Sequence, residues 1–241
     1  MPELHISIAA EELFRLGPLI VTNSLLTSWI VVFGLCVLFI KLSKSLKIIP
    51  SVKQLLIEWP IDMIYGLCQS IAEGRAAIFF PYIAVFFTFI LLSNWSGLIP
   101  GVGTILLKGH ESVPLFRAPT ADLNLTFALA IVSVFLIQYQ GVKALGVKYF
   151  GKFFSLKPAN AFIGSLELVS EFSKILSFSF RLFGNIFAGE VLLLVIAFLV
   201  RWFAPIPFYG LELFVGFIQA LVFSMLTLVF FNIATAHHEE E

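Results

Sequence analysis

Four long stretches of the chain contain no Asp, Glu, Lys or Arg: residues 16–40, 76–107, 123–142 and 213–236. A fifth stretch, residues 175–200, contains only Arg181 and Glu190. A helix needs about 20 consecutive apolar residues to cross a bilayer, so each stretch is long enough. Charged residues make up 12% of the chain, against about 25% in soluble domains. We predict an all-α membrane protein with about five transmembrane helices.

The five stretches predict a single membrane domain, residues 1–241. The composition does not change along the chain in a way that indicates a second domain. We predict an N-terminal segment at residues 1–15 and a C-terminal tail at residues 237–241. The five spans between them are predicted at residues 16–40, 80–100, 123–142, 162–200 and 208–236. The last two spans are joined by a short connection that contains Pro205 and Pro207. A connection this short predicts a long antiparallel helix hairpin.

Residues 51–74 alternate apolar residues with Lys53, Glu58, Asp62 and Glu73. This charge density is too high for contact with lipid chains. We predict an amphipathic helix on the inner membrane surface, with Pro60 as a point where it could bend. A re-entrant segment is the alternative.

Basic residues are distributed unevenly among the connections. Nine follow the first and third spans: Lys41, Lys44, Lys47, Lys53, Arg75, Lys143, Lys148, Lys152 and Lys157. Four lie on the opposite side: Arg15, Lys108, Arg117 and Arg201. Because basic loops stay on the cytoplasmic side, we predict an outer N-terminus and an inner C-terminus.

Arg181 lies deep in an apolar span. An arginine at this depth costs about 2.5–3.5 kcal/mol on insertion scales, and its side chain cannot lose the proton. It should therefore face protein or water rather than lipid. Ionisable groups at this depth commonly mark an ion path; a snorkelling or structurally paired arginine is the alternative.

Helical spacing divides the polar residues near Arg181 between two faces. At about 100° per residue, Asn185 and Glu167 lie within about 40° of Arg181. Glu167 is about 21 Å along the helix toward the inner side. Glu190 points about 180° away and lies about 13 Å toward the outer side. The spacing therefore indicates two offset polar paths, each reaching part of the way across the membrane.

Hairpin register places further polar groups beside these residues. Facing residues of an antiparallel pair have a constant index sum, which is 400 for Arg181 with Gln219 and 402 for Glu190 with Glu212. We therefore expect Gln219 beside Arg181, and the two glutamates in one outer layer. If their carboxyl groups are close, they titrate as a coupled pair.

Other motifs do not predict a function. Residues 146–152 approach a phosphate-binding loop, but Phe153 stands where a Ser or Thr should contact Mg²⁺. The Asn124 glycosylation sequon opens an apolar span, and His237 and His238 belong to a solvated tail. We expect no metal site, no cofactor and no direct ATP binding. The net charge of zero gives no case for nucleic acid.

Three ordered motifs carry a family resemblance. They are Asn94-Trp95-Ser96-Gly97-Leu98-Ile99-Pro100-Gly101, Pro119-Thr120-Ala121-Asp122-Leu123-Asn124, and residues 176–190 around Arg181. Together they resemble subunit a of the membrane sector of the F-type ATP synthase. The likeness continues through Gln219, covers roughly residues 75–236, and extends to the N-terminal quarter in layout only.

The resemblance implies that Arg181 is the essential charge facing the carboxylates of the c-ring, with Asn185 and Gln219 as polar residues of the same region. It implies a proton-channel stator that couples proton flow to ring rotation and ATP synthesis. The partners implied are the c-ring, peripheral-stalk subunit b, membrane lipid and the translocated proton. Such a chain is no enzyme on its own, and we expect it in the bacterial plasma membrane.

The resemblance also implies half-channel roles. Glu190 and Glu212 match the outer half-channel, and Glu167 matches a glutamate of the inner one. A small secondary transporter remains an alternative, although the chain lacks the internal repeats common among such proteins. A structural scaffold is the other alternative, and it would tolerate loss of Arg181. The choice between H⁺ and Na⁺ stays open.

The predicted orientation is testable by cysteine labelling in a background without Cys36 and Cys68. A cysteine at Lys152 should react with a membrane-impermeant thiol reagent only from the inner side. A cysteine at Lys108 should react only from the outer side. The reverse labelling pattern would contradict the topology.

Overall fold

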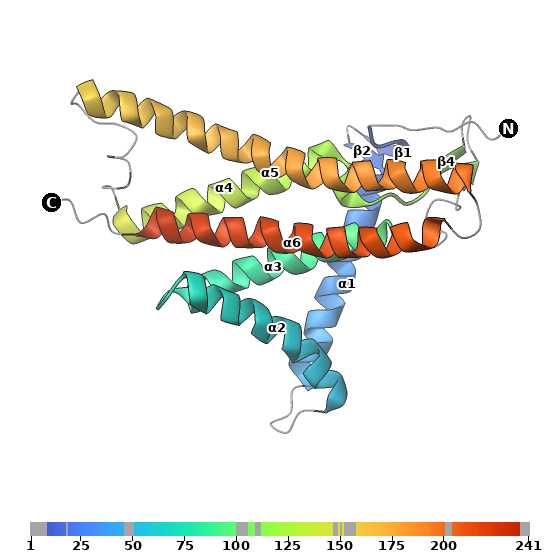
Figure 1. The fold of residues 1–241 in the computed structure, drawn as a ribbon, viewed down its shortest axis with the longest axis horizontal. Coiled ribbons are helices and arrows are strands. Elements are labelled where there is room, and N and C mark those ends of the chain that lie inside the picture. The colour runs from blue at the N-terminus through green and yellow to red at the C-terminus, as the bar shows by residue number, and fades with distance from the viewer. Residues whose placement is uncertain are drawn as a thin grey trace.

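The computed structural model describes residues 9–17, 19–45, 51–99, 106–108, 112–146, 149, 151, 158–200 and 204–236. Six α-helices dominate this part of the chain: α1 (Asn23–Ser45), α2 (Val52–Ile71), α3 (Ala76–Ser96), α4 (Leu123–Leu145), α5 (Pro158–Leu199) and α6 (Pro205–Thr235) (Figure 1). The all-α prediction is confirmed. The predicted tail at 237–241, most of the 146–152 loop and Arg201 lie outside the described residues.

Two short β-hairpins within the described residues were not predicted. Strand β1 (Glu12–Leu16) pairs antiparallel with β2 (Leu19–Thr22), and β3 (Leu106–Lys108) pairs with β4 (Ser112–Pro114). A 3-10 turn, η2 (Pro119–Ala121), precedes α4. The predicted first span at 16–40 therefore starts earlier than its helix, because residues 19–22 pair as a strand and α1 begins at Asn23.

Within the described residues, five helices are long and apolar enough to cross a membrane: α1, α3, α4, α5 and α6. The chain is therefore a multi-pass membrane protein. Helix α2 is not among the five, and it continues through Pro60 without a break. One side of α2 buries Ile64 and Cys68, while Trp59 stays exposed. Its position at the membrane surface stays a prediction.

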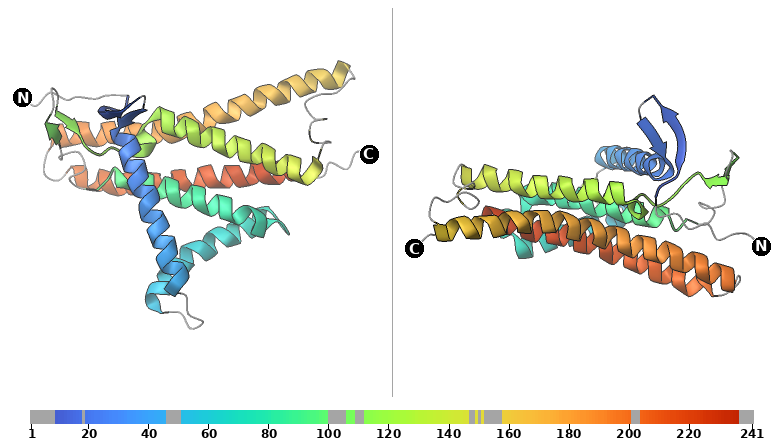
Figure 2. Two further views of the ribbon diagram at one scale, coloured as in Figure 1. Left: turned by 180° about the vertical axis from the view of Figure 1, so that it is seen from behind. Right: turned by 90° about the horizontal axis from the view of Figure 1, so that it is seen from above.

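Helices α5 and α6 form the predicted long antiparallel hairpin, and α3 and α4 pack against it as a second layer (Figures 1 and 2). Helix α1 crosses these four helices at a steep angle and contacts α3 and η2. Helix α6 touches α3, α4 and α5, so it is the centre of the bundle.

The length of α5 constrains how the hairpin sits in a bilayer. Its 42 residues make a helix about 63 Å long, twice the roughly 30 Å hydrocarbon core. To keep its apolar portion in the hydrocarbon, α5 must be strongly inclined. Helix α1 has 23 residues, about 35 Å, and can cross close to the membrane normal. The steep crossing of α1 and the hairpin fits both requirements. Distances along α5 therefore correspond to smaller differences in depth.

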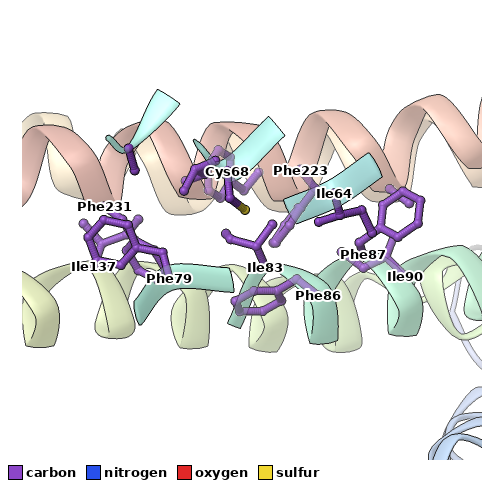
Figure 3. Close-up of a cluster of buried hydrophobic side chains, with 14 of the residues drawn as sticks. Ile64, Cys68, Phe79, Ile83, Phe86, Phe87, Ile90, Ile137, Phe223 and Phe231 are labelled. Carbon is purple, nitrogen blue, oxygen red and sulfur yellow. The ribbon is translucent and has the colours of Figure 1, made fainter. Parts of the chain in front are cut away.

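Aromatic and branched side chains fill the space between the layers (Figure 3). Phe79 on α3 packs against Phe231 on α6 with ring centroids 5.2 Å apart, and Phe86 packs against Phe223 at 5.6 Å. Burial raises the pKa of the Cys68 thiol to about 11, so this cysteine stays protonated near neutral pH. The core fixes α6 against α3 along most of its length.

Candidate functional site

Arg181 is exposed on the surface of α5, near the middle of that helix. Its guanidinium Nη2 donates to Ser177 Oγ at 3.3 Å, one turn earlier on the same helix. No carboxylate among the described residues forms a salt bridge with it. A permanent cation on an apolar helix is thus left facing outward, available to a partner.

Asn185 and Gln219 connect α5 and α6 beside Arg181. Asn185 Nδ2 donates to Gln219 Oε1 at 2.6 Å, and Gln219 is only 4% exposed. The index sum predicts Gln219 beside Arg181; in the structure the Gln219 side chain bonds Asn185, one turn further along α5.

Glu212 on α6 is buried, with 6% of its surface exposed. Its carboxyl group lies directly against Gly189 on α5, where an added Cβ would come within 2.0 Å of Glu212 Oε2. The absence of a side chain at Gly189 therefore makes room for the carboxyl group. This contact places Glu212 in the layer of Glu190, as the index sum predicted.

Glu190 and Glu212 contact different parts of the chain. Glu190 Oε2 lies 3.4 Å from Nε of Arg117, which is 7% exposed and stands just before η2. Arg117 is therefore an ion-pair partner of Glu190. That Glu190 and Glu212 titrate together stays a prediction.

The sequence analysis counted Arg117 only as a basic residue of a predicted outer connection. It lies in a short irregular segment before η2, whose place in the fold no helical period reveals. Arg117 does stand two residues before the Pro119–Asn124 motif, which was the one available signal. Its Cζ also lies 5.9 Å from the centroid of the Phe187 ring on α5.

Glu167 lies near the start of α5 and is half-buried. It is fourteen residues from Arg181, and the structure does not bring the two together. One turn further on, Lys174 Nζ bonds Glu171 Oε1 at 2.8 Å and lies 4.6 Å from the Phe230 ring centroid. The N-terminal portion of α5 thus carries ionisable groups to which the sequence analysis assigned no role.

The motifs that contain Asn94 and Thr120 hold α6 by hydrogen bonds. Asn94 Nδ2 donates to the carbonyl oxygen of Gly216 at 2.8 Å, and Thr120 Oγ1 donates to Asn94 Oδ1 at 2.7 Å. Trp95 Nε1 donates to the carbonyl oxygen of Leu213 at 3.1 Å. A Cβ on Gly216 would come within 3.2 Å of Asn94. These bonds hold the turn of α6 between Glu212 and Gln219.

Asp122 anchors the segment that carries Arg117. Its Oδ1 accepts from the backbone N–H of Asn124 at 2.9 Å and caps α4, as an Asp in this position commonly does. Its Oδ2 accepts from Ser24 Oγ of α1 at 2.6 Å. The N-terminal ends of α1 and α4 are thereby joined close to Arg117.

An apolar helix hairpin with an exposed arginine at mid-length, polar side chains across its seam and carboxyl groups toward one end is typical of a membrane protein that moves ions. The comparisons agree. The model of the family described as ATP synthase A chain matches residues 25–232. ATP synthase subunit a 2 of Bradyrhizobium sp. (strain BTAi1) is 30% identical over 222 residues, which cover 92% of each chain. The chain belongs to the ATP synthase A chain family, and the resemblance found in the sequence is confirmed.

The contact between Gly189 and Glu212 is testable by substitution. Gly189→Ala should lower the melting temperature of the purified complex, because the new methyl group must displace a buried carboxyl group, at a cost of about 1–3 kcal/mol. Gly184→Ala is the matched control, since a Cβ there meets nothing within 4 Å. Glu212→Ala should rescue the Gly189→Ala variant. Equal melting temperatures for the two alanine variants would contradict the contact.

Proposed function

We propose that this chain is the proton-channel stator of the ATP synthase membrane sector, with two offset half-channels and one essential arginine. The observation that carries the proposal is the position of Arg181. It is exposed on a long apolar helix, and among the described residues it hydrogen-bonds only to Ser177 of the same helix. A charge of this kind needs a partner carboxylate at membrane depth, which a ring of small subunits with membrane-embedded carboxylates would supply.

The outer half-channel runs, in this proposal, along the hairpin end that contains Glu212 and Glu190. Both groups lie toward the α5–α6 connection, and both are at least partly buried beside other polar atoms. A proton entering there would reach the ring carboxylate. Gln219 and Asn185 would then order the region next to Arg181, because their hydrogen bond fixes both amides.

The inner half-channel begins near Glu167, at the other end of α5. The neighbouring Glu171–Lys174 pair supplies further polar atoms on that portion of the helix. The inner end of α6 is held by Arg75, which donates to the carbonyl oxygen of Thr235, and by Asn232, which donates to that of Ile71. The inclination of α5 separates the two paths laterally as well as in depth.

Rotation follows from the cost of moving charge into lipid. A protonated ring carboxyl is neutral and can pass through the hydrocarbon, whereas an ionised one is too costly to transfer. Arg181 attracts the deprotonated carboxylate and keeps the two half-channels from exchanging protons directly. Each elementary charge that crosses 100 mV releases about 2.3 kcal/mol, which the ring converts to torque.

The assembly follows from the same proposal. The c-ring would lie against the exposed face of the hairpin, and peripheral-stalk subunit b would hold the chain in place. We propose the bacterial plasma membrane as the location, with the N-terminus outside and the C-terminus in the cytoplasm. ATP chemistry would belong to other subunits.

Arg181→Ala should abolish proton-driven ATP synthesis in membrane vesicles, because no fixed cation would bind the returning carboxylate. Arg181→Lys should lose most of the activity, since lysine provides a movable point charge in place of a planar fork. Arg15→Ala is the control, because Arg15 forms an exposed surface pair with Glu12. Normal synthesis by the Arg181→Ala complex would refute the proposal.

Glu190→Gln should cause a large loss of passive and ATP-driven proton flux with assembly intact, because an amide cannot relay protons. Glu212→His should be milder, since histidine exchanges protons between pH 5 and 8. That variant should also change how flux depends on outside pH. Unchanged flux in assembled Glu190→Gln complexes would remove Glu190 from the path.

A further inference from the structure

A nearly buried ion pair lies in the N-terminal half of α5, about two to three turns before Arg181. Lys174 Nζ donates to Glu171 Oε1 at 2.8 Å, and the two side chains are only 16% and 12% exposed. Both residues belong to the part of α5 that is long and apolar enough to cross a membrane, Gly164–Leu199. Both also precede the third family motif, residues 176–190, so no family motif contains them.

The pair lies at the seam between α5 and α6. The Lys174 ammonium group is 4.6 Å from the centroid of the Phe230 ring on α6, within the range of a cation–π contact. The helices packed against α5 are otherwise uncharged here: α6 has no Asp, Glu, Lys or Arg in residues 213–236, and α4 has none in residues 123–142. Among α4, α5 and α6, the acidic and basic groups of this part of the bundle therefore come from α5.

Stability alone does not explain an ion pair in this place. Charged side chains at membrane depth are costly, and those found there commonly serve ion movement. Replacing a buried ion pair by apolar side chains of similar volume is often neutral or stabilising, by about 1–4 kcal/mol. Apolar side chains would therefore hold the seam as well. What they could not supply is a carboxyl group that takes up and releases protons.

Polar side chains recur at every turn of α5 between Glu167 and Arg181. They stand three or four residues apart, at Glu167, Glu171, Lys174, Ser177 and Arg181. Ser177 Oγ accepts from Arg181 Nη2 at 3.3 Å. Glu167 is about 21 Å from Arg181 along the helix, whereas Glu171 is about 15 Å away. Glu171 is therefore the carboxyl group nearest to Arg181 on the N-terminal half of α5.

We propose that Glu171 is a proton-carrying group of the inner half-channel and that Lys174 is its positioning residue. This inference rests on the proposed inner half-channel and adds a second carboxyl group between Glu167 and Arg181. A proton released by a ring carboxyl group passes through water and the Ser177 hydroxyl to the Glu171 carboxylate, which becomes a neutral carboxyl group. Glu171 then releases this proton toward Glu167 and the inner aqueous phase, and its carboxylate pairs with Lys174 again.

The test replaces the ion pair by apolar side chains, in the double variant Glu171→Leu/Lys174→Met. The seam keeps its packing, so the melting temperature of the purified complex should stay unchanged or rise. Passive and ATP-driven proton flux in reconstituted vesicles should fall by about tenfold or more, since proton transfer by a positioned side chain commonly contributes about 10²–10⁴-fold. Full flux from this variant is the result expected of a pair that only holds α5 against α6, and it would overturn the proposal.

Single substitutions separate the roles of the two residues, and they also decide the question if the double variant does not assemble. Glu171→Gln can still accept from Lys174 but cannot carry a proton, so it should lose flux as the double variant does. Lys174→Arg keeps a cation beside Phe230 and should retain more flux than Lys174→Met. Full flux from assembled Glu171→Gln complexes overturns the role of Glu171. Equal flux from the two Lys174 variants overturns the positioning role.

Glu12→Leu/Arg15→Met is the matched control, because Glu12 and Arg15 form an exposed ion pair with the same spacing and the same length of 2.8 Å. Its flux should equal that of the unaltered complex. Glu167→Gln separates this inference from the proposed function. Full flux in Glu171→Gln with flux lost in Glu167→Gln overturns the role of Glu171 and leaves the inner path intact. Full flux in both variants overturns the inner path itself.

Discussion

A guanidinium group that cannot lose its proton constrains this structure more than any other group. Arg181 lies in an apolar stretch, residues 175–200, whose only other ionisable residue is Glu190, so it must meet water or a partner's charge. Its exposed position leaves the cation available, while Ser177 takes only one of its five N–H donors. The length of α5 then matters, because an inclined helix can bring Arg181 to mid-membrane and still extend polar residues toward both surfaces.

Small residues allow polar groups to be buried around this cation. Gly189 admits the Glu212 carboxyl group, and Gly216 admits Asn94 to the backbone of α6. An unpaired buried polar group costs about 1–3 kcal/mol, so close approach of the helices and hydrogen bonding across them are needed together. Further along the bundle, pairs of hydroxyl groups also form hydrogen bonds between helices: Ser133 with Thr227 at 2.9 Å and Thr126 with Ser179 at 3.2 Å.

The regular parts of the fold were predictable because helices have fixed periods. The helix hairpin, the position of Arg181 on its surface and the common layer of Glu190 and Glu212 follow from spacing and index sums. The hydrogen bond between Asn185 and Gln219 was not predicted, since index sums pair backbone positions and do not say which side chains bond. Arg117 reaches Glu190 from an irregular segment before η2, whose placement depends on tertiary contacts such as Arg117 N–H to Thr27 Oγ1. No local pattern encodes such contacts.

The most direct test of the account is whether the Arg181 face of α5 meets the carboxylate of a ring subunit. Ala188 is exposed and lies within about 20° of Arg181 around the helix. In a background without Cys36 and Cys68, Ala188→Cys should form a disulfide with a cysteine placed beside the ring carboxylate. Phe135→Cys, on the exposed surface of α4, should not. Cross-linking from Phe135→Cys but not from Ala188→Cys would contradict the account.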